Sequence, residues 1–389
     1  MSKRKILTVL LTLLLVAGVA ALATRATASR SQSQAGRILV GVFDDPMTLG
    51  TPDKGFPLLK GLRAQVVRIT LNWRAVATKR PKAAGNPADP AYDWAAYDRA
   101  VLLAKKNKIQ VLFGIQGTPG WANRRRSARI APTNYRDLQN FARAAATRYS
   151  GTFERKDSDT ETTLLPAVRL WLAWNEPNNP AFLAPQYKRV HGRWLAFSAY
   201  AYARICNAVY TGVHTAGAGA ERVACGATDP FGNNQPKSRR PSISPLAFLR
   251  LSKRYGLRRF DAWAHHPYAP RPSEAPAAKP KKLKSTSVIL GNIGDLTKEV
   301  SRLYGAKPIW ITEYGYQTRP PDRYFGVSWK TQAKYLSQAY AIARKNRRIG
   351  MFLWFLIKDE RAIKGWQSGF FTASGARKPA YTAFRRLKH

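Results

Sequence analysis

The sequence is poor in acidic residues and histidine, and each shortage excludes a class of site. It has 22 Asp and Glu against 65 Lys and Arg, which gives a formal net charge of +43 over 389 residues. Five histidines, with no spaced His/Cys cluster and no evident carboxylate cage, argue against a metal centre, and we expect no cofactor. No nucleophile elbow is present to support a Ser-His-Asp triad.

Cysteine is also scarce, since the chain contains only Cys206 and Cys225. An exported protein meets an oxidising compartment, where these two residues could form a disulfide. Two buried free thiols fit the sequence equally well, because sequence alone does not fix the distance between them. Both alternatives stay open at this point.

Long apolar runs are confined to the N-terminus. Lys3, Arg4 and Lys5 precede apolar residues 6–23, and the small residues 26–28 offer a cleavage site. We therefore expect residues 1–28 to be a signal peptide, or an uncleaved N-terminal anchor, and residues 29–36 to be a polar tether. This predicts a secreted or cell-envelope-associated protein with no later transmembrane span.

The excess of basic residues predicts a strongly positive surface. Such a field attracts polyanions such as nucleic acid, anionic lipid or acidic envelope polymers. The cations are spread along the chain, apart from local runs such as residues 124–126 and 279–284, and no nucleic-acid-binding motif accompanies them. We therefore expect a solvated basic surface and no specific nucleic-acid partner, with electrostatic association with anionic cell-envelope polymers as a secondary alternative.

Apolar strands alternate with amphipathic helices from residue 37 onward. The expected strands are residues 37–43, 65–71, 109–115, 168–174, 222–226, 260–265, 308–312 and 350–355. The expected helices are residues 94–106, 135–149, 186–210, 245–255, 294–304, 329–346 and 379–387, with none evident after the first strand. The strands are short and almost continuously apolar, as parallel strands covered on both faces require.

This alternation predicts a parallel sheet. Eight strand–helix units in about 350 residues fit one closed (β/α)8 TIM barrel, so residues 37–389 should form a single α/β domain. A doubly wound open sheet is the alternative, but no Gly-rich phosphate loop follows the first strand. The active sites of such barrels lie at the carboxyl ends of the strands, so polar residues there are the candidates for function.

Two glutamates directly follow predicted strands. Glu176 lies in the run Trp174-Asn175-Glu176-Pro177 after the fourth strand, and Glu313 follows the seventh strand. The ends of these strands should face one shared pocket. Paired carboxylates across a pocket suit the hydrolysis of a glycosidic bond, where one donates a proton and the other attacks the anomeric carbon. We expect Glu176 to be the acid/base, Glu313 to be the nucleophile, and Asn175 to bind a sugar hydroxyl.

These motifs resemble clan A of the retaining glycoside hydrolases, which carry the acid/base after strand four and the nucleophile after strand seven. The resemblance covers essentially the whole mature chain. Residues 118–122 and 378–381 are similar to segments of family 39 and neighbouring family 5, which includes cellulase-like enzymes. The loops after strands five and six match no subfamily, so the substrate stays open.

The resemblance also implies substrate-site roles for other residues. Arg68 is similar to the strand-two arginine that bonds the nucleophile, and a buried arginine independently needs a carboxylate partner. His266 and Tyr268 resemble a strand-six pair beside the nucleophile. Adjacent His265 must point to the opposite face of the strand, as a packing residue. Trp354 resembles the aromatic floor under the sugar, with filling of the barrel as the alternative.

Four further residues have weaker signals. Trp73 and Trp121 are candidate sugar platforms. Asp44 and Asp45, after the first strand, could bind a hydroxyl or cap the loop.

The resemblance implies a secreted retaining glycoside hydrolase that degrades a β-linked poly- or oligosaccharide by double displacement. A transglycosylase would use the same site with a sugar acceptor. A non-catalytic envelope protein that binds carbohydrate or polyanions is the third reading.

Overall fold

The structure is a computed structural model that describes residues 38–216, 219–280 and 286–388. The predicted signal peptide and tether lie outside these residues. Residues Leu39–His389 form one compact unit by their contacts.

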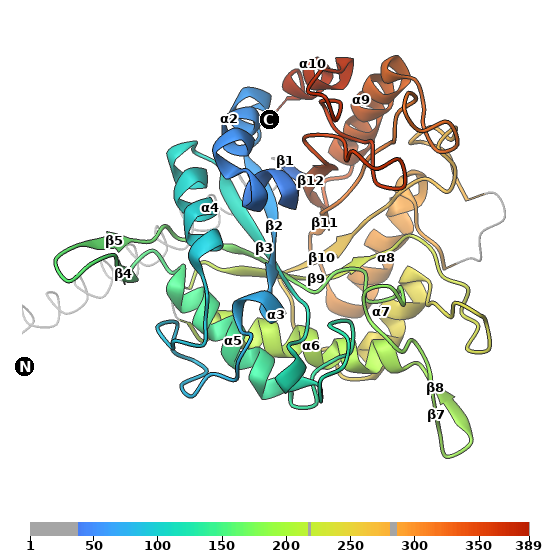
Figure 1. Ribbon diagram of the computed structural model, residues 1–389. Helices are drawn as coiled ribbons and strands as arrows, with labels where there is room; N and C mark the ends of the chain where they lie inside the picture. Colours follow the sequence, from blue (N-terminus) through green and yellow to red (C-terminus); the bar gives the residue numbers. More distant parts are fainter. Residues whose placement is uncertain (1–37, 217–218, 281–285, 389) are drawn as a thin grey trace, which may run out of the picture. The chain divides into compact units, whose positions relative to one another are not determined.

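Eight parallel strands close into a barrel (Figure 1). They are β1 (Leu39–Phe43), β2 (Val66–Asn72), β3 (Gln110–Gln116), β6 (Leu170–Ala173), β9 (Arg222–Thr228), β10 (Ala262–His265), β11 (Ile309–Ile311) and β12 (Ile349–Phe355). Each strand pairs with its neighbours in the chain, and β1 closes the ring against β12. The predicted (β/α)8 barrel is therefore confirmed.

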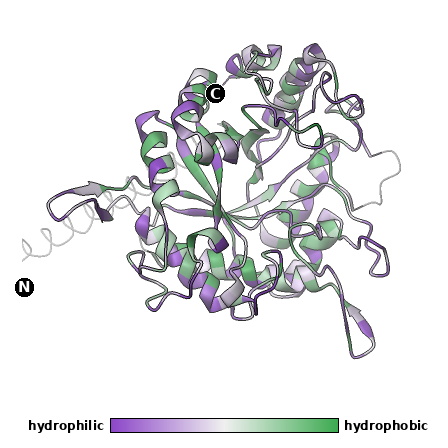
Figure 2. Ribbon diagram, viewed as in Figure 1, coloured by the Kyte–Doolittle hydropathy of each residue, from purple (hydrophilic) through white to green (hydrophobic). Residues whose placement is uncertain are grey.

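Helices follow each strand and cover the outside of the barrel. They are α2 (Pro52–Leu62), α3 (Trp73–Val76), α4 (Ala95–Lys106), α5 (Tyr135–Arg148), α6 (Phe197–His214), α7 (Pro245–Arg254), α8 (Ile293–Tyr304), α9 (Trp329–Lys345) and α10 (Pro379–Arg385). Their hydrophilic residues lie mainly on the outer faces, while the central strands are hydrophobic (Figure 2). Burial of the opposite, apolar faces against the strands stabilises this arrangement.

The inside of the barrel is filled by alternate residues of the strands. The buried interior cluster comprises Val66, Leu112, Leu170, Leu172, Ala224, Ala227, Ala262, Ala264, Trp310, Met351 and Leu353, with Leu39 packed against it. Because alternate residues of a strand point to opposite faces, the next interior position of β2 after Val66 is Arg68. This strand therefore changes from apolar filling to a charged group toward its carboxyl end.

The helix after the first strand is present although the sequence pattern does not reveal it. Helix α2 contains Gly55, Pro57 and Gly61, which are poor helix formers and hide the helical pattern. Only glycine fits at position 55, because a Cβ there would lie 2.1 Å from the backbone oxygen of Met47. Tertiary packing thus overrides local propensity in this unit.

The prediction of a helix over residues 186–210 is wrong for its first part. The chain instead forms the hairpin of β7 (Lys188–Val190) and β8 (Arg193–Leu195), and α6 begins only at Phe197. His191 and Gly192 form the two-residue turn with φ of 46° and 75°. A turn with two positive φ values matches the twist of antiparallel strands and favours glycine.

A second hairpin joins β4 (Glu154–Lys156) to β5 (Thr162–Leu164), between α5 and β6. Both hairpins extend away from the barrel (Figure 1).

Among the described residues, no helix has the length and apolarity needed to cross a membrane.

Cys206 and Cys225 form a disulfide, with their Cα atoms 6.0 Å apart. Cys206 lies on α6 and Cys225 on β9, so the bond fastens a covering helix to the barrel wall. This settles the alternative that the sequence left open.

Candidate active site

Glu176 and Glu313 meet at the carboxyl end of the barrel, although 137 positions separate them in the sequence. Glu176 follows β6 and Glu313 follows β11. One oxygen of each carboxylate and one nitrogen of His266 all lie within 4.8 Å of one another. The side chains of Glu176 and Glu313 are 10% and 11% exposed, so both touch solvent. The structure therefore brings the two predicted carboxylates to one water-accessible site.

The backbone around Glu176 is held in an unusual conformation. Trp174 and Glu176 have φ of 68° and 36°, in the left-handed region that side chains other than glycine rarely adopt. The Glu176 amide donates to the carbonyl oxygen of Ala227 at 2.9 Å, and Ala227 itself has φ of 46°. Such strain persists only where neighbouring structure enforces it, and it is concentrated at functional sites. Here it fixes the position of one carboxylate.

Glu313 is held by a cation and a phenol. Arg68, on β2, lies 3.3 Å from Glu313 Oε2 through Nη1, and its side chain is 2% exposed. Tyr268 Oη donates to Glu313 Oε1 at 2.9 Å. Each carboxylate oxygen thus has its own donor, and the ionised form of Glu313 is the form that both donors favour.

His266 connects the two carboxylates. Its Nδ1 lies 2.9 Å from Glu176 Oε1 and 3.9 Å from Glu313 Oε2. Its Nε2 lies 3.2 Å from Arg68 Nη1 and 3.0 Å from Thr312 Oγ1. Burial lowers the pKa of His266 to about 3, so the ring is neutral at ordinary pH.

The hydrogen bonds of His266 assign its proton. A guanidinium only donates, so Nε2 must be the acceptor and Nδ1 must carry the hydrogen. His266 Nδ1 then donates to Glu176 Oε1. The other oxygen of Glu176 is therefore the one left to carry an acid proton.

The two carboxylates differ in their proton affinity. Burial raises the pKa of Glu176 to about 7, and the positive charge of Arg68 opposes that rise only in part. Burial also raises the pKa of Glu313, but Arg68 opposes it. Because Arg68 and Tyr268 bond Glu313 directly, Glu313 should ionise first and Glu176 should keep its proton to higher pH.

The same three groups, Glu176, His266 and Glu313, have the spacing of metal ligands. A divalent cation bound there would lie beside the guanidinium of Arg68, and Coulomb repulsion opposes that arrangement. We therefore interpret the cluster as a set of proton donors and acceptors.

Asn175 also belongs to this site. Its Oδ1 accepts a hydrogen bond from Arg68 Nη2 at 2.6 Å, and this bond orients the amide group. Its Nδ2 makes no hydrogen bond to the other described residues. The orientation leaves a donor for a ligand hydroxyl. His265, in contrast, bonds Thr228 and the backbone oxygen of Val288 away from the carboxylates, as a packing residue should.

None of the three tryptophans named by the sequence has a hydrogen bond to Glu176 or Glu313 in the described part of the chain. Trp354 is fully buried, and its Nε1 donates to Ser368 O at 2.7 Å on the outer side of the barrel. Trp73 is also fully buried. Trp121 donates to Ala77 O, and Arg80 lies 4.5 Å from the centre of its ring. The structure does not bring these residues to the candidate site.

Phe355 and Trp366 are the aromatic residues of β12 and its following loop that connect to the site. Phe355 follows Leu353 at the next interior position of β12. Trp366 packs against both Phe355 and Tyr268, with ring centroids 5.3 Å from each. Sequence reasoning missed Trp366 because it lies eleven residues beyond the strand, in a loop with no regular pattern.

Sequence reasoning also missed a third carboxylate near Glu176. Asp229 follows β9, and Asn179 Nδ2 donates to its Oδ2 at 3.0 Å. Burial, and secondarily the charge of Glu176, raise the pKa of Asp229 to about 7. The rule that identified Glu176, a polar residue just after an apolar strand, would have identified Asp229 as well.

Asp44 has a structural role. Its Oδ1 accepts from Met47 N, and its Oδ2 accepts from the amides of Ile357 and Lys358. It therefore ties the loop after β1 to the loop after β12. Asp45 accepts from the amide of Thr70 at 2.8 Å.

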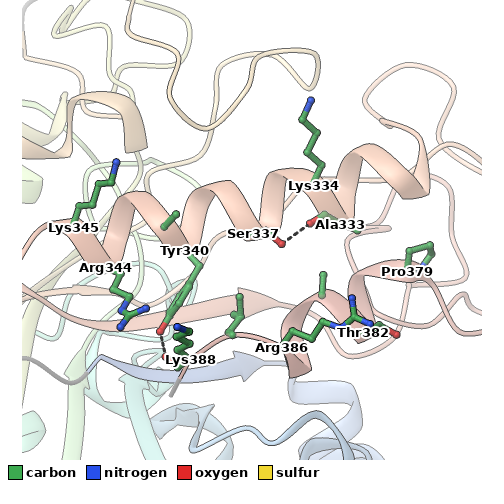
Figure 3. A pocket seen from close by; sticks show the side chains of 13 residues that line it. Ala333, Lys334, Ser337, Tyr340, Arg344, Lys345, Pro379, Thr382, Arg386 and Lys388 are labelled. Atoms are coloured by element: carbon green, nitrogen blue, oxygen red, sulfur yellow. Dashed lines mark hydrogen bonds between the residues drawn. The ribbon is translucent and has the colours of Figure 1, made fainter.

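A surface groove of about 980 Å³ lies elsewhere, between α9 and α10 (Figure 3). Among the described residues, its lining includes Lys334, Arg344, Arg386 and Lys388 but no carboxylate side chain. It therefore does not offer the paired carboxylates of glycoside hydrolysis, and the glutamate pair stays the candidate active site.

Comparison with known proteins agrees with this assignment of the fold. Residues 287–383 match the family model of the glycosyl hydrolase catalytic core, a segment that contains Glu313. No curated protein matches the sequence.

Solved structures resemble the barrel at low sequence identity. A family 39 glycoside hydrolase from Bacteroides cellulosilyticus WH2 is 19% identical with a TM-score of 0.60, over 90% of this chain and 64% of that one. A glucosidase from Croceicoccus marinus is 14% identical with a TM-score of 0.62, over 90% and 67%. A β-glucosidase from Thermotoga maritima is 12% identical with a TM-score of 0.55, over 90% and 96%.

The chain thus spans about two thirds of the length of the first two of these proteins. At these identities the likeness is one of fold, shared with a group of barrel enzymes that cleave glycosides. The resemblance that the sequence indicates is therefore confirmed: residues 287–383 match the model of the glycosyl hydrolase catalytic core, and the barrel is similar to those of a family 39 glycoside hydrolase and a glucosidase.

Proposed function

We propose that this chain is a retaining glycoside hydrolase that cleaves β-linked poly- or oligosaccharides. The observation that carries the proposal is the close approach of Glu176 and Glu313, which bring one carboxylate oxygen each to within 4.8 Å of the other. Retaining enzymes hold their carboxyl groups roughly 5–5.5 Å apart, whereas inverting enzymes leave about 6.5–9.5 Å for a water molecule. The observed spacing supports a direct attack by one carboxylate.

The environments of the two carboxylates support their separate roles. Glu313, ionised beside Arg68, attacks the anomeric carbon while the bond to the leaving oxygen breaks. Glu176 gives its proton to that oxygen, and a glycosyl ester forms on Glu313. Glu176 then takes a proton from water, the water oxygen bonds to the anomeric carbon, and the carboxylate of Glu313 leaves.

The stereochemistry of hydrolysis tests this mechanism. We expect the first product formed from an aryl β-glycoside to be the β-anomer, because two displacements restore the starting configuration. Proton NMR of the anomeric region, recorded before mutarotation, measures it. First appearance of the α-anomer would contradict the retaining mechanism, and transfer of the sugar to an added acceptor would identify a transglycosylase.

The pH dependence of kcat/KM provides a second test. Glu176 must be protonated, so activity should fall as pH rises through about 7, the pKa of Glu176 and of its neighbour Asp229. An Asp229→Asn variant removes a negative charge beside Glu176, so the pKa of Glu176 should fall and this basic limb should move to lower pH. The exposed Asp159, on the β4–β5 hairpin, provides the matched control as Asp159→Asn. An unmoved limb in Asp229→Asn would contradict the coupling.

Export is a further part of the proposal. The disulfide between Cys206 and Cys225 is typical of proteins that fold in oxidising compartments. The basic and apolar pattern of residues 1–28 supports a signal peptide or anchor, followed by the tether of residues 29–36 and one catalytic domain. The net charge of +43 supports association of the exported protein with anionic cell-envelope polymers.

A further inference from the structure

A small cavity adjoins the candidate nucleophile. It has a volume of about 120 Å³, and Tyr268, Arg271, Tyr316, Gln317, Phe325 and Trp366 are among its lining residues. Tyr268 belongs to both places, because its hydroxyl donates to Glu313 while its ring forms one wall of the cavity. A sugar that reacts at Glu313 would therefore lie beside this space.

The walls of the cavity are suited to a sugar ring. Trp366 is 37% exposed and packs against Tyr268 at 5.3 Å between ring centroids. Phe325, 61% exposed, lines the same cavity. The negative faces of aromatic rings attract the polarised C–H groups of a sugar, as they attract other positive edges.

Arg271 supplies the only cation in this lining, and its guanidinium has no hydrogen bond or ion pair with the described residues. The other polar lining side chain with several donors or acceptors, Gln317, accepts from the amide of Gln367. A free guanidinium offers five donors in a fork that matches a carboxylate or sulfate. Arg271 is thus positioned to recognise an anionic group.

The acids around the cavity are already engaged within the protein. Asp322 accepts from the amides of Tyr324 and Phe325, and Glu360 accepts from the amide of Trp366. Asp359 pairs with the buried Lys378. In the described parts of the loops after β10, β11 and β12, Glu274 is the one residue whose carboxylate has no hydrogen bond or ion pair.

Apart from Lys378, several cations of the same loops have no acidic partner. The described residues provide no ion pair for Arg271, Arg319, Arg323, Arg361 and Lys364, and all five are exposed. Positive charges around a cleft with apolar walls raise the local concentration of anions. The surroundings of the cavity therefore have the charge that complements an anionic sugar polymer.

We propose that this cavity is a subsite for a sugar bearing an anionic substituent, with the ring stacked on Trp366 and the anion bound by Arg271. The proposal rests on the proposed function, because it takes Glu313 as the group that attacks the same sugar. It names the substrate class as anionic glycans, whose charge is a carboxylate or a sulfate ester.

Three aryl glycosides that differ only at C6 test the proposal: 4-nitrophenyl β-glucoside, the corresponding β-glucuronide and the glucoside 6-sulfate. We expect wild-type kcat/KM to be higher for an anionic glycoside than for the neutral one. Arg271→Ala should lower kcat/KM for the anionic substrate by about 10- to 100-fold, as loss of a charge-assisted hydrogen bond does, with little change for the glucoside. Whichever anion loses more identifies the natural charge.

The exposed Arg239, on the loop after β9 and outside the cavity lining, provides the control as Arg239→Ala. This substitution also removes one positive charge, but it should not change kcat/KM for any of the three substrates. Equal wild-type rates on all three substrates, or equal losses in both variants, would overturn the subsite while leaving the hydrolase function intact.

A binding measurement separates the two proposals. Calorimetry of the Glu176→Gln variant with the same three glycosides, at 0.15 M salt, does not require turnover. Tighter binding of an anionic glycoside that is lost in Glu176→Gln/Arg271→Ala supports the subsite even if no substrate is hydrolysed. Binding that is equal for neutral and anionic glycosides refutes it even if all three are hydrolysed.

Discussion

Replacement of Glu313 by alanine will lower kcat on every β-glycoside that the protein cleaves, by on the order of 10⁴-fold or more. The variant lacks the group proposed to bond the anomeric carbon, so the glycosyl ester should not form. The rate of aryl glycoside hydrolysis measures the loss. A small anion such as azide should fit the space left by the side chain and restore cleavage, with a glycosyl azide of inverted configuration as product.

Replacement of Glu176 will have a different signature. Glu176→Ala removes the proton donor, so glycosides with poor leaving groups should lose most of their rate, whereas activated aryl glycosides should still form the glycosyl ester. Glu154→Ala, on the exposed β4 strand, is the control and should keep wild-type rates. Full activity in Glu313→Ala, or equal losses on activated and poor leaving groups in Glu176→Ala, would refute the assigned roles.

Replacement of Lys378 by methionine will lower the free energy of unfolding by about 3–5 kcal/mol, the usual effect of leaving a buried charge without its partner. Lys378 and Asp359 are 0% and 1% exposed and lie 2.7 Å apart. Lys378 Nζ also donates to Thr318 Oγ1 and Gln367 O. One ammonium thus joins the loops after β11 and β12 to the start of α10. Guanidinium unfolding followed by circular dichroism measures the change.

A second substitution separates this effect from a general loss of packing. Lys378→Met/Asp359→Leu removes both charges, so most of the lost stability should return, because neither ion is then buried alone. Lys334→Met, on the exposed face of α9, should have little effect. A double variant no more stable than Lys378→Met would show that the pair itself is not the source of the stability.

The strands and the two glutamates could be predicted because both follow from simple spacing rules. Strands covered on both faces are apolar throughout, and Glu176 and Glu313 directly follow two of them. Helix α2 could not be predicted, because Gly55, Pro57 and Gly61 disfavour a helix that tertiary packing nevertheless stabilises. The β7–β8 hairpin was not predicted for the opposite reason, because its apolar and basic residues resemble the pattern of an amphipathic helix.

Predicting the aromatic residues of the site required knowing whether each side chain faces the inside or the outside of the barrel. Trp354 and Phe355 are adjacent on β12, so a difference of one position decides which of them points inward. The sequence indicates aromatic residues there, but not the face. Trp366 depends on how a long loop folds back over Phe355, which local sequence cannot specify.

The β4–β5 hairpin has a practical consequence. It belongs to the connection from α5 to β6, which runs at the amino ends of the barrel strands, whereas Glu176 and Glu313 lie at the carboxyl ends. A peptide tag inserted within its turn, residues 157–161, would attach the molecule to a bead or sensor by the side opposite the catalytic groups. Immobilised in that orientation, the protein would present the end of the barrel that carries Glu176 and Glu313 to insoluble material such as cell-wall fragments.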